Sequence, residues 1–142
     1  MSRENVELHR RLYALFNARD FGAFVVRFDP QIEFHSRFVV LGGVTVYRGH
    51  DGLRNWNQGY EEVWGDQVHI ELEAYFDLGE QTLALGVLHA RGRQSGAETS
   101  LRLAQVARWR DGLCAYLKSY ADLDEALGEL RLSADELERI DP

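Results

Sequence analysis

Hydrophobic residues at helical spacing predict three helices in the N-terminal half of the chain. The first is expected to start near Ser2, because a serine cap and the acidic Glu4 both favour a helix N-terminus. Its apolar stripe is Leu8, Leu12, Leu15 and Phe16. Asp20 can cap a second, short helix, and Asp29-Pro30 is expected to end it because proline disfavours helical geometry in the residue before it. Asp51 can cap the third, whose apolar face is Leu53, Trp56, Tyr60, Val63 and Trp64 and which Gly65-Asp66 closes.

From residue 68 onward the period of the hydrophobic pattern changes to two, which is typical of half-buried strands. Strands are expected over 68–76, 82–91, 101–109 and 113–120, with a hairpin turn at Arg110-Asp111-Gly112. Earlier, residues 32–40 favour a strand that Gly42-Gly43 breaks, and a short strand over 44–47 completes a hairpin. Helices that precede a meander of antiparallel strands predict an α+β fold with helices on one face of the sheet.

The end of the chain is expected to be a helical tail. Ser133-Ala-Asp-Glu136 has the pattern of a capping box, with Leu132 and Leu137 placed as a hydrophobic staple. We see no internal repeat, low-complexity run or linker in the 142 residues. We therefore expect one domain over residues 1–142, with a core over about 4–130 and a helical tail over 131–142.

Composition narrows the class of protein. The net charge of -7 argues against nucleic acid as a partner, because binding phosphates requires a basic surface. The single cysteine, Cys114, can form no internal disulfide and suits a reducing cytoplasm. No secretory signal and no apolar run long enough to span a bilayer is visible. The five histidines form no helical i, i+4 pair and have no cysteine companion, so we expect no metal. The glycine patterns of P-loop and dinucleotide sites are absent, so we expect no organic cofactor. We expect a cytoplasmic protein without membrane contact.

Several segments resemble the SnoaL-like branch of the nuclear transport factor 2-like superfamily, over roughly residues 4 to 130. The matching segments are Leu15-Phe-Asn-Ala-Arg-Asp20, Phe28-Asp-Pro-Gln-Ile-Glu-Phe-His35, Tyr47-Arg-Gly-His-Asp-Gly-Leu53, Arg91-Gly-Arg-Gln-Ser-Gly96, Arg108-Trp-Arg-Asp-Gly112 and Ser119-Tyr-Ala-Asp-Leu-Asp-Glu-Ala-Leu127. The resemblance implies a cone, in which a curved, mostly antiparallel (mixed) sheet wraps around the long first helix. The wide end of such a cone holds an apolar pocket for a small molecule.

The resemblance also implies a homodimer, since members commonly dimerise through the outer face of the sheet. On the strand alternation above, that face carries Arg102, Ala104, Val106 and Arg108. The superfamily includes cyclases, isomerases, hydrolases, dehydratases and proteins without catalytic activity. It therefore implies the fold more sharply than the reaction.

The catalytic residues of relatives carry over poorly to this sequence. Steroid isomerases of the superfamily use a tyrosine on the first helix, an aspartate base on the first strand and an acidic aspartate on a late strand. Leu12, Phe34 and Gln105 occupy those positions here, and none is an acid or a base. A register shift of one residue would offer Tyr13, Glu33 or His35 instead. The Asp-Arg-Asp set of epoxide hydrolases is not recognisable, and for a cyclase-like acid or base only Asp122, Glu33 and the histidines are candidates.

Two residues stand out as candidates for chemistry. His35 lies on the first strand, at the place where the implied fold opens toward its cavity. Its imidazole has the pKa range of a general acid or base. The alternative is a strand histidine that bonds the backbone or faces solvent. Gln105 interrupts the buried face formed by Leu101, Leu103, Ala107 and Trp109. A buried amide needs hydrogen-bond partners, so Gln105 either bonds a neighbouring side chain or contacts a ligand.

Further candidates are expected to line the pocket. The stripe of Trp56, Tyr60 and Trp64 either packs only in the core or also contacts the ligand, as the pocket wall that the resemblance implies. Phe34 and Leu12 are expected to line the pocket with it. His89 lies at the end of an apolar strand face, which reaches either the mouth of the pocket or solvent. Tyr120 can offer its hydroxyl to the cavity. Asp122 is either a catalytic acid or the cap of the following helix, with Glu125 three residues later.

Two functions fit these residues. The first is a cofactor-independent acid/base enzyme that acts on an apolar, carbonyl-bearing molecule, with His35 as base and Gln105 orienting the substrate. The second is a dimeric ligand-binding or protein-interaction module without catalysis. A pocket whose polar groups all pair with one another favours the second, whereas an unpaired histidine beside a roomy cavity favours the first.

Overall fold

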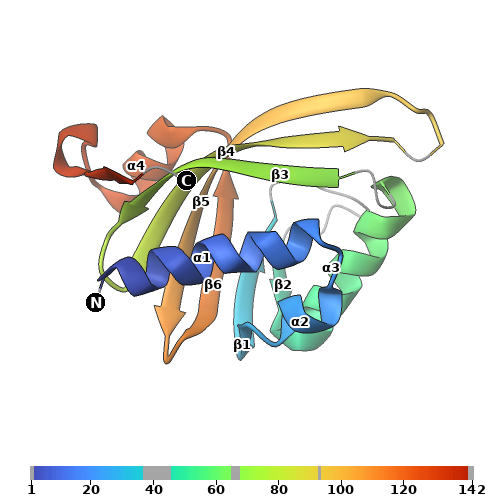
Figure 1. Ribbon diagram of the computed structural model, residues 1–142, viewed down its shortest axis with the longest axis horizontal. Helices are drawn as coiled ribbons and strands as arrows, with labels where there is room; N and C mark the ends of the chain where they lie inside the picture. Colours follow the sequence, from blue (N-terminus) through green and yellow to red (C-terminus); the bar gives the residue numbers. More distant parts are fainter. Residues whose placement is uncertain (1, 37–45, 65–67, 93, 141–142) are drawn as a thin grey trace.

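A curved sheet with the strand order β2-β1-β6-β5-β4-β3-β7 runs through the computed structural model (Figure 1). The structure describes residues 2–36, 46–64, 68–92 and 94–140. The strands are β1 Phe28–His35, β2 Val46–Arg48, β3 Val68–Asp77, β4 Gln81–Arg91, β5 Glu98–Arg110, β6 Leu113–Tyr120 and β7 Arg139–Ile140. Neighbours are antiparallel, except that β1 runs parallel to β6. The sheet is therefore mixed, as the resemblance implies.

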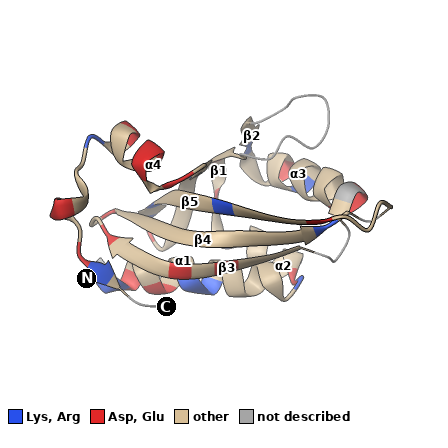
Figure 2. Ribbon diagram, turned by 90° about the horizontal axis from the view of Figure 1, so that it is seen from above, with Lys and Arg blue, Asp and Glu red and all other residues tan. Residues whose placement is uncertain are grey.

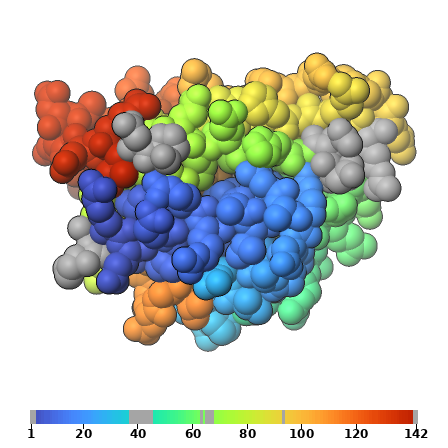
Figure 3. Space-filling view, in the orientation of Figure 1, coloured from blue at the N-terminus to red at the C-terminus, as the bar shows by residue number. Residues whose placement is uncertain are grey.

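Helices lie on both faces of this sheet. They are α1 Ser2–Asn17, α2 Phe21–Val25, α3 Gly49–Trp64 and α4 Leu123–Leu130. α1 runs along the face that we call the inner face, with α2 and α3 beside its C-terminal end (Figures 1 and 3). Alternate residues of β5 separate the two faces: Leu103 and Ala107 pack on the inner side, and Ala104 and Val106 pack on the outer side with α4.

The local signals at the second helix and the last hairpin act as expected. The Asp20 carboxylate caps α2 by accepting from the backbone N–H of Ala23. Asp111 and Gly112 have φ angles of 54° and 78°, so they form the two-residue turn with left-handed backbone that joins β5 to β6. The predicted strands over 68–76, 82–91, 101–109 and 113–120 all form, with ends that differ by at most a few residues.

The predicted end of the second helix is wrong. α2 ends at Val25, and Asp29-Pro30 lies inside β1. Pro30 falls in the stretch between Phe28 and Glu33 where the pairing of β1 with β6 shifts register. Proline has no N–H for the strand ladder, so an irregular stretch tolerates it. The expected strand ends over 37–45 and the predicted helix end at Gly65-Asp66 fall outside the described residues.

The predicted helical tail over 131–142 is also wrong. The backbone N–H of Ser133 does donate to the Glu136 carboxylate, as in a capping box, but only the 3-10 turn Ala134–Glu136 follows. Beyond it the chain extends as β7, which pairs with β3 at Tyr75. The edge of β3 offers unpaired backbone groups, and pairing there competes with a longer helix.

α4 covers part of the outer face that we expected to be a dimer interface. Ala104 and Val106 are fully buried in the single chain, where they pack with Ala126 and Leu127 of α4. Arg102 and Arg108 of the same strand are exposed. Acidic residues gather on α4 and the segment after it (Figure 2). The expectation that Ala104 and Val106 form an exposed interface is therefore wrong, because an amphipathic helix of the same chain buries them.

None of the helices that the structure describes is long and apolar enough to cross a membrane. The expected cytoplasmic location stays a prediction.

Candidate functional site

A chain of hydrogen bonds between buried side chains links α1 to the inner face of β4 and β5. His9 Nδ1 lies 2.8 Å from Thr82 Oγ1, and His9 Nε2 lies 3.3 Å from Gln105 Oε1. Gln105 Nε2 donates to Tyr13 Oη at 2.9 Å. Trp109 Nε1 donates to Thr82 Oγ1 at 2.9 Å. His9, Thr82 and Gln105 are among the few polar side chains of the described residues that are buried.

Simple periodicity explains why these residues meet. His9 and Tyr13 are four residues apart on α1 and therefore share one side of the helix. Gln105 and Trp109 are four residues apart on β5 and point to the same face of the sheet. Thr82 pairs across β4 and β5 with Ala107, which lies between them. The register of the hairpin thus places the Thr82 hydroxyl between two polar groups of the neighbouring strand.

Burial keeps the two titratable members of this chain uncharged at neutral pH. Loss of solvent lowers the pKa of His9 to about 4, so its imidazole is neutral at pH 7. Burial also raises the pKa of Tyr13 far above its usual value, so its hydroxyl keeps its proton. The chain of hydrogen bonds therefore joins neutral donors and acceptors.

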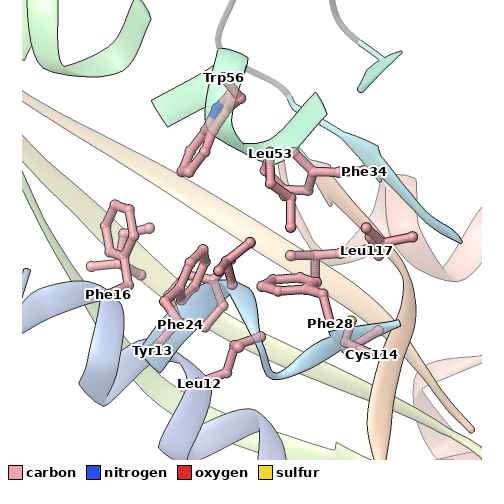
Figure 4. Packing of buried hydrophobic residues seen from close by; sticks show 14 of the residues in the cluster. Leu12, Tyr13, Phe16, Phe24, Phe28, Phe34, Leu53, Trp56, Cys114 and Leu117 are labelled. Carbon is pink, nitrogen blue, oxygen red and sulfur yellow. The ribbon is translucent and has the colours of Figure 1, made fainter. Parts of the chain in front are cut away.

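Aromatic rings form the wall beside this polar chain. Trp56 of α3 makes an edge-on contact with Phe34 of β1, with ring centroids 4.9 Å apart, and lies 4.8 Å from Tyr60. Phe16 and Phe24 complete the wall, and the labelled side chains of α1, α2, α3, β1 and β6 point toward one shared interior (Figure 4). Trp56 is 5% exposed, and its indole Nε1 has no hydrogen-bond partner. A buried donor without a partner in the protein is unfavourable and is satisfied when an acceptor atom lies beside it.

A narrow cleft leads toward this wall between α1, α2 and α3. It has a volume of about 20 Å³, and Phe16 and Phe24 line it together with Arg19. A cleft of this size is too small to hold a ring-sized molecule unless aromatic side chains move.

Five of the predicted ligand contacts come together on the inner side of the sheet. They are Leu12, Phe34, Trp56, Tyr60 and Gln105, all buried. Trp64, at the end of α3, is half-buried and packs against the same cluster. Gln105 bonds neighbouring side chains, which is one of the two alternatives that its burial left open. Tyr13 rather than Leu12 is the helix residue that reaches it. Whether these residues contact a ligand stays a prediction.

His35 lies on the opposite side of the sheet from this interior. The register of β1 turns Phe34 inward, so Glu33 and His35 point to the outer face. His35 Nε2 bonds the Glu33 carboxylate, which Arg48 also contacts at 3.0 Å. The hydrogen bond from His35 holds the pKa of Glu33 below its usual value. The expected orientation of His35 toward the cavity is wrong, and a catalytic role for it stays a prediction.

The remaining candidates also lie away from the interior. His89 is exposed on β4, bonds Ser100 Oγ at 3.0 Å, and lines a hollow of about 410 Å³ with His69. Tyr120 is buried in the outer cluster with Leu127 of α4. The Asp122 carboxylate caps α4 by accepting from the backbone N–H of Glu125 at 2.9 Å, which is the alternative to an acid role. Among the described residues, no group of three or more His, Cys, Asp or Glu is placed to hold a metal ion.

Sequence reasoning missed His9. The predicted stripe on the first helix ran through Leu8 and Leu15, which are only half-buried. The buried side of α1 is Val6, His9, Leu12, Tyr13 and Phe16. The spacing of His9, Tyr13 and Phe16 is itself helical, so a polar residue on an otherwise apolar stripe was the available signal.

The family model of the SnoaL-like domain matches residues 9–117. No curated protein matches the sequence. A nuclear transport factor 2-like protein from Burkholderia pseudomallei is 20% identical with a TM-score of 0.75, over 90% of this chain and 97% of that one. TerC, co-crystallised with polyporic acid, is 19% identical with a TM-score of 0.73, over 89% and 97%. A protein with a ketosteroid isomerase-like fold from Catenulispora acidiphila, in complex with trimethylamine, is 16% identical with a TM-score of 0.70, over 91% and 95%. These likenesses confirm the predicted fold.

Proposed function

Because the chain belongs to the family of SnoaL-like domains, we propose that it binds a small, largely apolar molecule between α1, α3 and β1. The unpartnered indole N–H of the buried Trp56 carries this proposal. A ligand that places an acceptor atom there satisfies a donor that the protein itself leaves without a partner. The aromatic rings around it supply the apolar contact area that binds a flat ring system.

Binding fits the interior better than acid/base catalysis does. Both ring nitrogens of His9 are engaged by Thr82 and Gln105, and its low pKa removes it from general acid or base work near neutral pH. No Asp or Glu is buried among the described residues. His9, Thr82 and Gln105 pair with one another and with Tyr13 and Trp109, so none of them is left as a free acid or base, which favours a ligand-binding module.

Two structural neighbours support a small organic ligand. TerC was co-crystallised with polyporic acid, and the protein from Catenulispora acidiphila holds trimethylamine. We infer that the interior of this chain, which has the same fold, also binds a small molecule. The residues of this chain that line the interior select the ligand.

Isothermal titration with matched bicyclic probes tests the proposal. We expect 1-indanone, which carries a carbonyl acceptor, and indane, which has the same ring system without it, both to bind. Trp56→Phe keeps an aromatic ring but removes the N–H, so it should weaken 1-indanone about 3- to 10-fold and leave indane nearly unchanged. Tyr116→Phe, which removes a polar group on the outer face, is the matched control and should change neither. Failure of both probes to bind or to raise the melting temperature would contradict the proposal.

We further propose that two copies of the chain associate through the part of the outer face that α4 leaves uncovered. A hollow of about 900 Å³ lies there, lined by polar residues of β1, β5 and β6 such as Glu33, Arg108 and Tyr116. Light scattering with size-exclusion chromatography tests this, and Arg108→Glu should shift the species toward one chain. A single species at the 16.3 kDa of one chain at all concentrations would exclude it.

A further inference from the structure

The hydrogen-bond chain behind Tyr13 can run in only one direction without losing a bond. The indole N–H of Trp109 is a donor and never an acceptor, so the Thr82 hydroxyl accepts from it. Thr82 is fully buried, and the one acceptor that the described contacts offer its own hydrogen is His9 Nδ1. The hydroxyl therefore accepts on one side and donates on the other.

The role of Thr82 as a donor to His9 then sets which atoms donate and which accept between His9 and Gln105. A neutral imidazole that accepts at Nδ1 carries its proton on Nε2, and that N–H donates to Gln105 Oε1. The amide group of Gln105 is consequently oriented with Nε2 toward Tyr13, to which it donates. The opposite direction would make Thr82 accept twice and would leave its buried hydroxyl hydrogen without a partner, which is unfavourable.

Tyr13 is the last member of this chain. Its oxygen accepts from Gln105, and none of the described contacts uses its hydroxyl hydrogen. We propose that Trp109, Thr82 and His9 act as positioning residues that fix Tyr13 as a donor, so that the ligand of the interior presents an acceptor oxygen, as in a ketone or an ether, whose two lone pairs accept from Tyr13 and from the indole N–H of Trp56. This inference rests on the proposed function, because it names the chemical class of the molecule bound at the same site.

Three bicyclic probes of similar size distinguish the ligand classes in isothermal titration. 1-Indanone offers only an acceptor, indole offers only an N–H donor, and indane offers neither. In the unmodified protein we expect 1-indanone to bind about 3- to 10-fold more tightly than indane, and indole to bind no more tightly than indane. If indole binds as tightly as 1-indanone or more tightly, the assignment of Tyr13 as a donor is overturned.

The positioning residues are tested by substitutions that allow the donors and acceptors of the hydrogen-bond chain to reverse. Thr82→Val removes the donor to His9 Nδ1, so His9 and Gln105 can reverse and the preference of 1-indanone over indole should fall to about one or invert. Thr82→Ser keeps the hydroxyl and should retain the preference. Trp109→Phe removes the obligatory donor while keeping an aromatic ring, and it should also lower the preference; it serves as the second variant if Thr82→Val does not fold. An unchanged preference in both releasing variants would contradict the inference.

A spectroscopic measurement decides the direction without any ligand. Long-range proton–nitrogen correlation spectra of histidine-labelled protein distinguish the two neutral tautomers, and His9→Gln identifies the His9 signals among the five histidines. We expect Nε2 of His9 to be the protonated nitrogen near pH 7. A proton on Nδ1 would overturn the inference while leaving ligand binding itself intact. If no probe binds but His9 carries the proton on Nε2, the proposed function fails and the direction of the chain stands.

Discussion

His9 Nε2 lies 3.3 Å from Gln105 Oε1, and this contact between two buried side chains ties the first half of α1 to the middle of β5. The amide of Gln105 also reaches Tyr13, so one strand residue holds two successive turns of the helix. The polar residue that breaks the apolar alternation of β5 is therefore a structural link as well as a candidate ligand contact.

Gln105→Leu should destabilise the protein by about 1–3 kcal/mol, because it leaves buried polar atoms of His9 and Tyr13 without partners. Urea denaturation at pH 7 measures the change in the free energy of unfolding. Gln31→Leu, at an exposed position of β1, is the control and should stay within about 0.5 kcal/mol of the parent. Equal effects of the two substitutions would mean that the buried contacts of Gln105 contribute nothing.

The free energy of unfolding should fall steeply below pH 6.5. Burial lowers the pKa of His9 from 6.5 to about 4 in the folded state, so the unfolded chain binds the proton first. This stabilising contribution is present above pH 6.5 and is lost as the pH falls toward 4, with a full size of about 3 kcal/mol. Denaturation curves at several pH values measure it. His9→Gln should flatten the slope between pH 6.5 and 4, whereas His69→Gln at an exposed position should preserve it.

Gly86→Ala should destabilise the protein by about 1–3 kcal/mol, because the added methyl group forces β3 and β4 apart. A Cβ at Gly86 would lie 2.2 Å from the backbone oxygen of Glu71, beside the register shift between Leu72 and Ala74. Thermal unfolding gives the comparison with Gly128→Ala in α4, where nothing lies within 4 Å of the new Cβ. The helix variant should be neutral or stabilised by up to about 1 kcal/mol. A harmless Gly86→Ala would show that the strands can separate at no cost.

Leu127→Ala should weaken the cover that α4 provides for the outer face. Leu127 packs with Ala104 and Val106, and removing its buried methyl groups should cost about 2–4 kcal/mol. Hydrogen exchange should accelerate in α4 before it does so in α1, because few elements other than β5 and β6 hold α4. Leu130→Ala, at a half-buried position of the same helix, should have a smaller effect. Uniform acceleration across the chain would instead indicate that α4 unfolds only with the whole domain.

Local signals in the sequence determined much of the fold. The alternation of β5 predicted that Gln105 is buried, Asp111-Gly112 predicted a tight hairpin, and Asp20 predicted a helix cap. Each of these depends on neighbours within a few residues, for which spacing and backbone preference are sufficient. The signals failed where a distant partner competed. The capping box at Ser133 forms, but the residues that follow pair with the edge of β3 as β7 instead of continuing a helix.

The candidate site depended on contacts that no local pattern contains. Local patterns show which residue types are available to the site: apolar stripes on helices, alternating strands, and one amide on a buried face. The packing of the folded chain selects His9 as the partner of this amide and turns Phe34 rather than His35 to the interior. It also places α4 over Ala104 and Val106. The reason is physical: a shift of one strand residue, or a small rotation of a helix, exchanges the side chains that face the core, and packing against distant elements selects among these nearly equivalent arrangements.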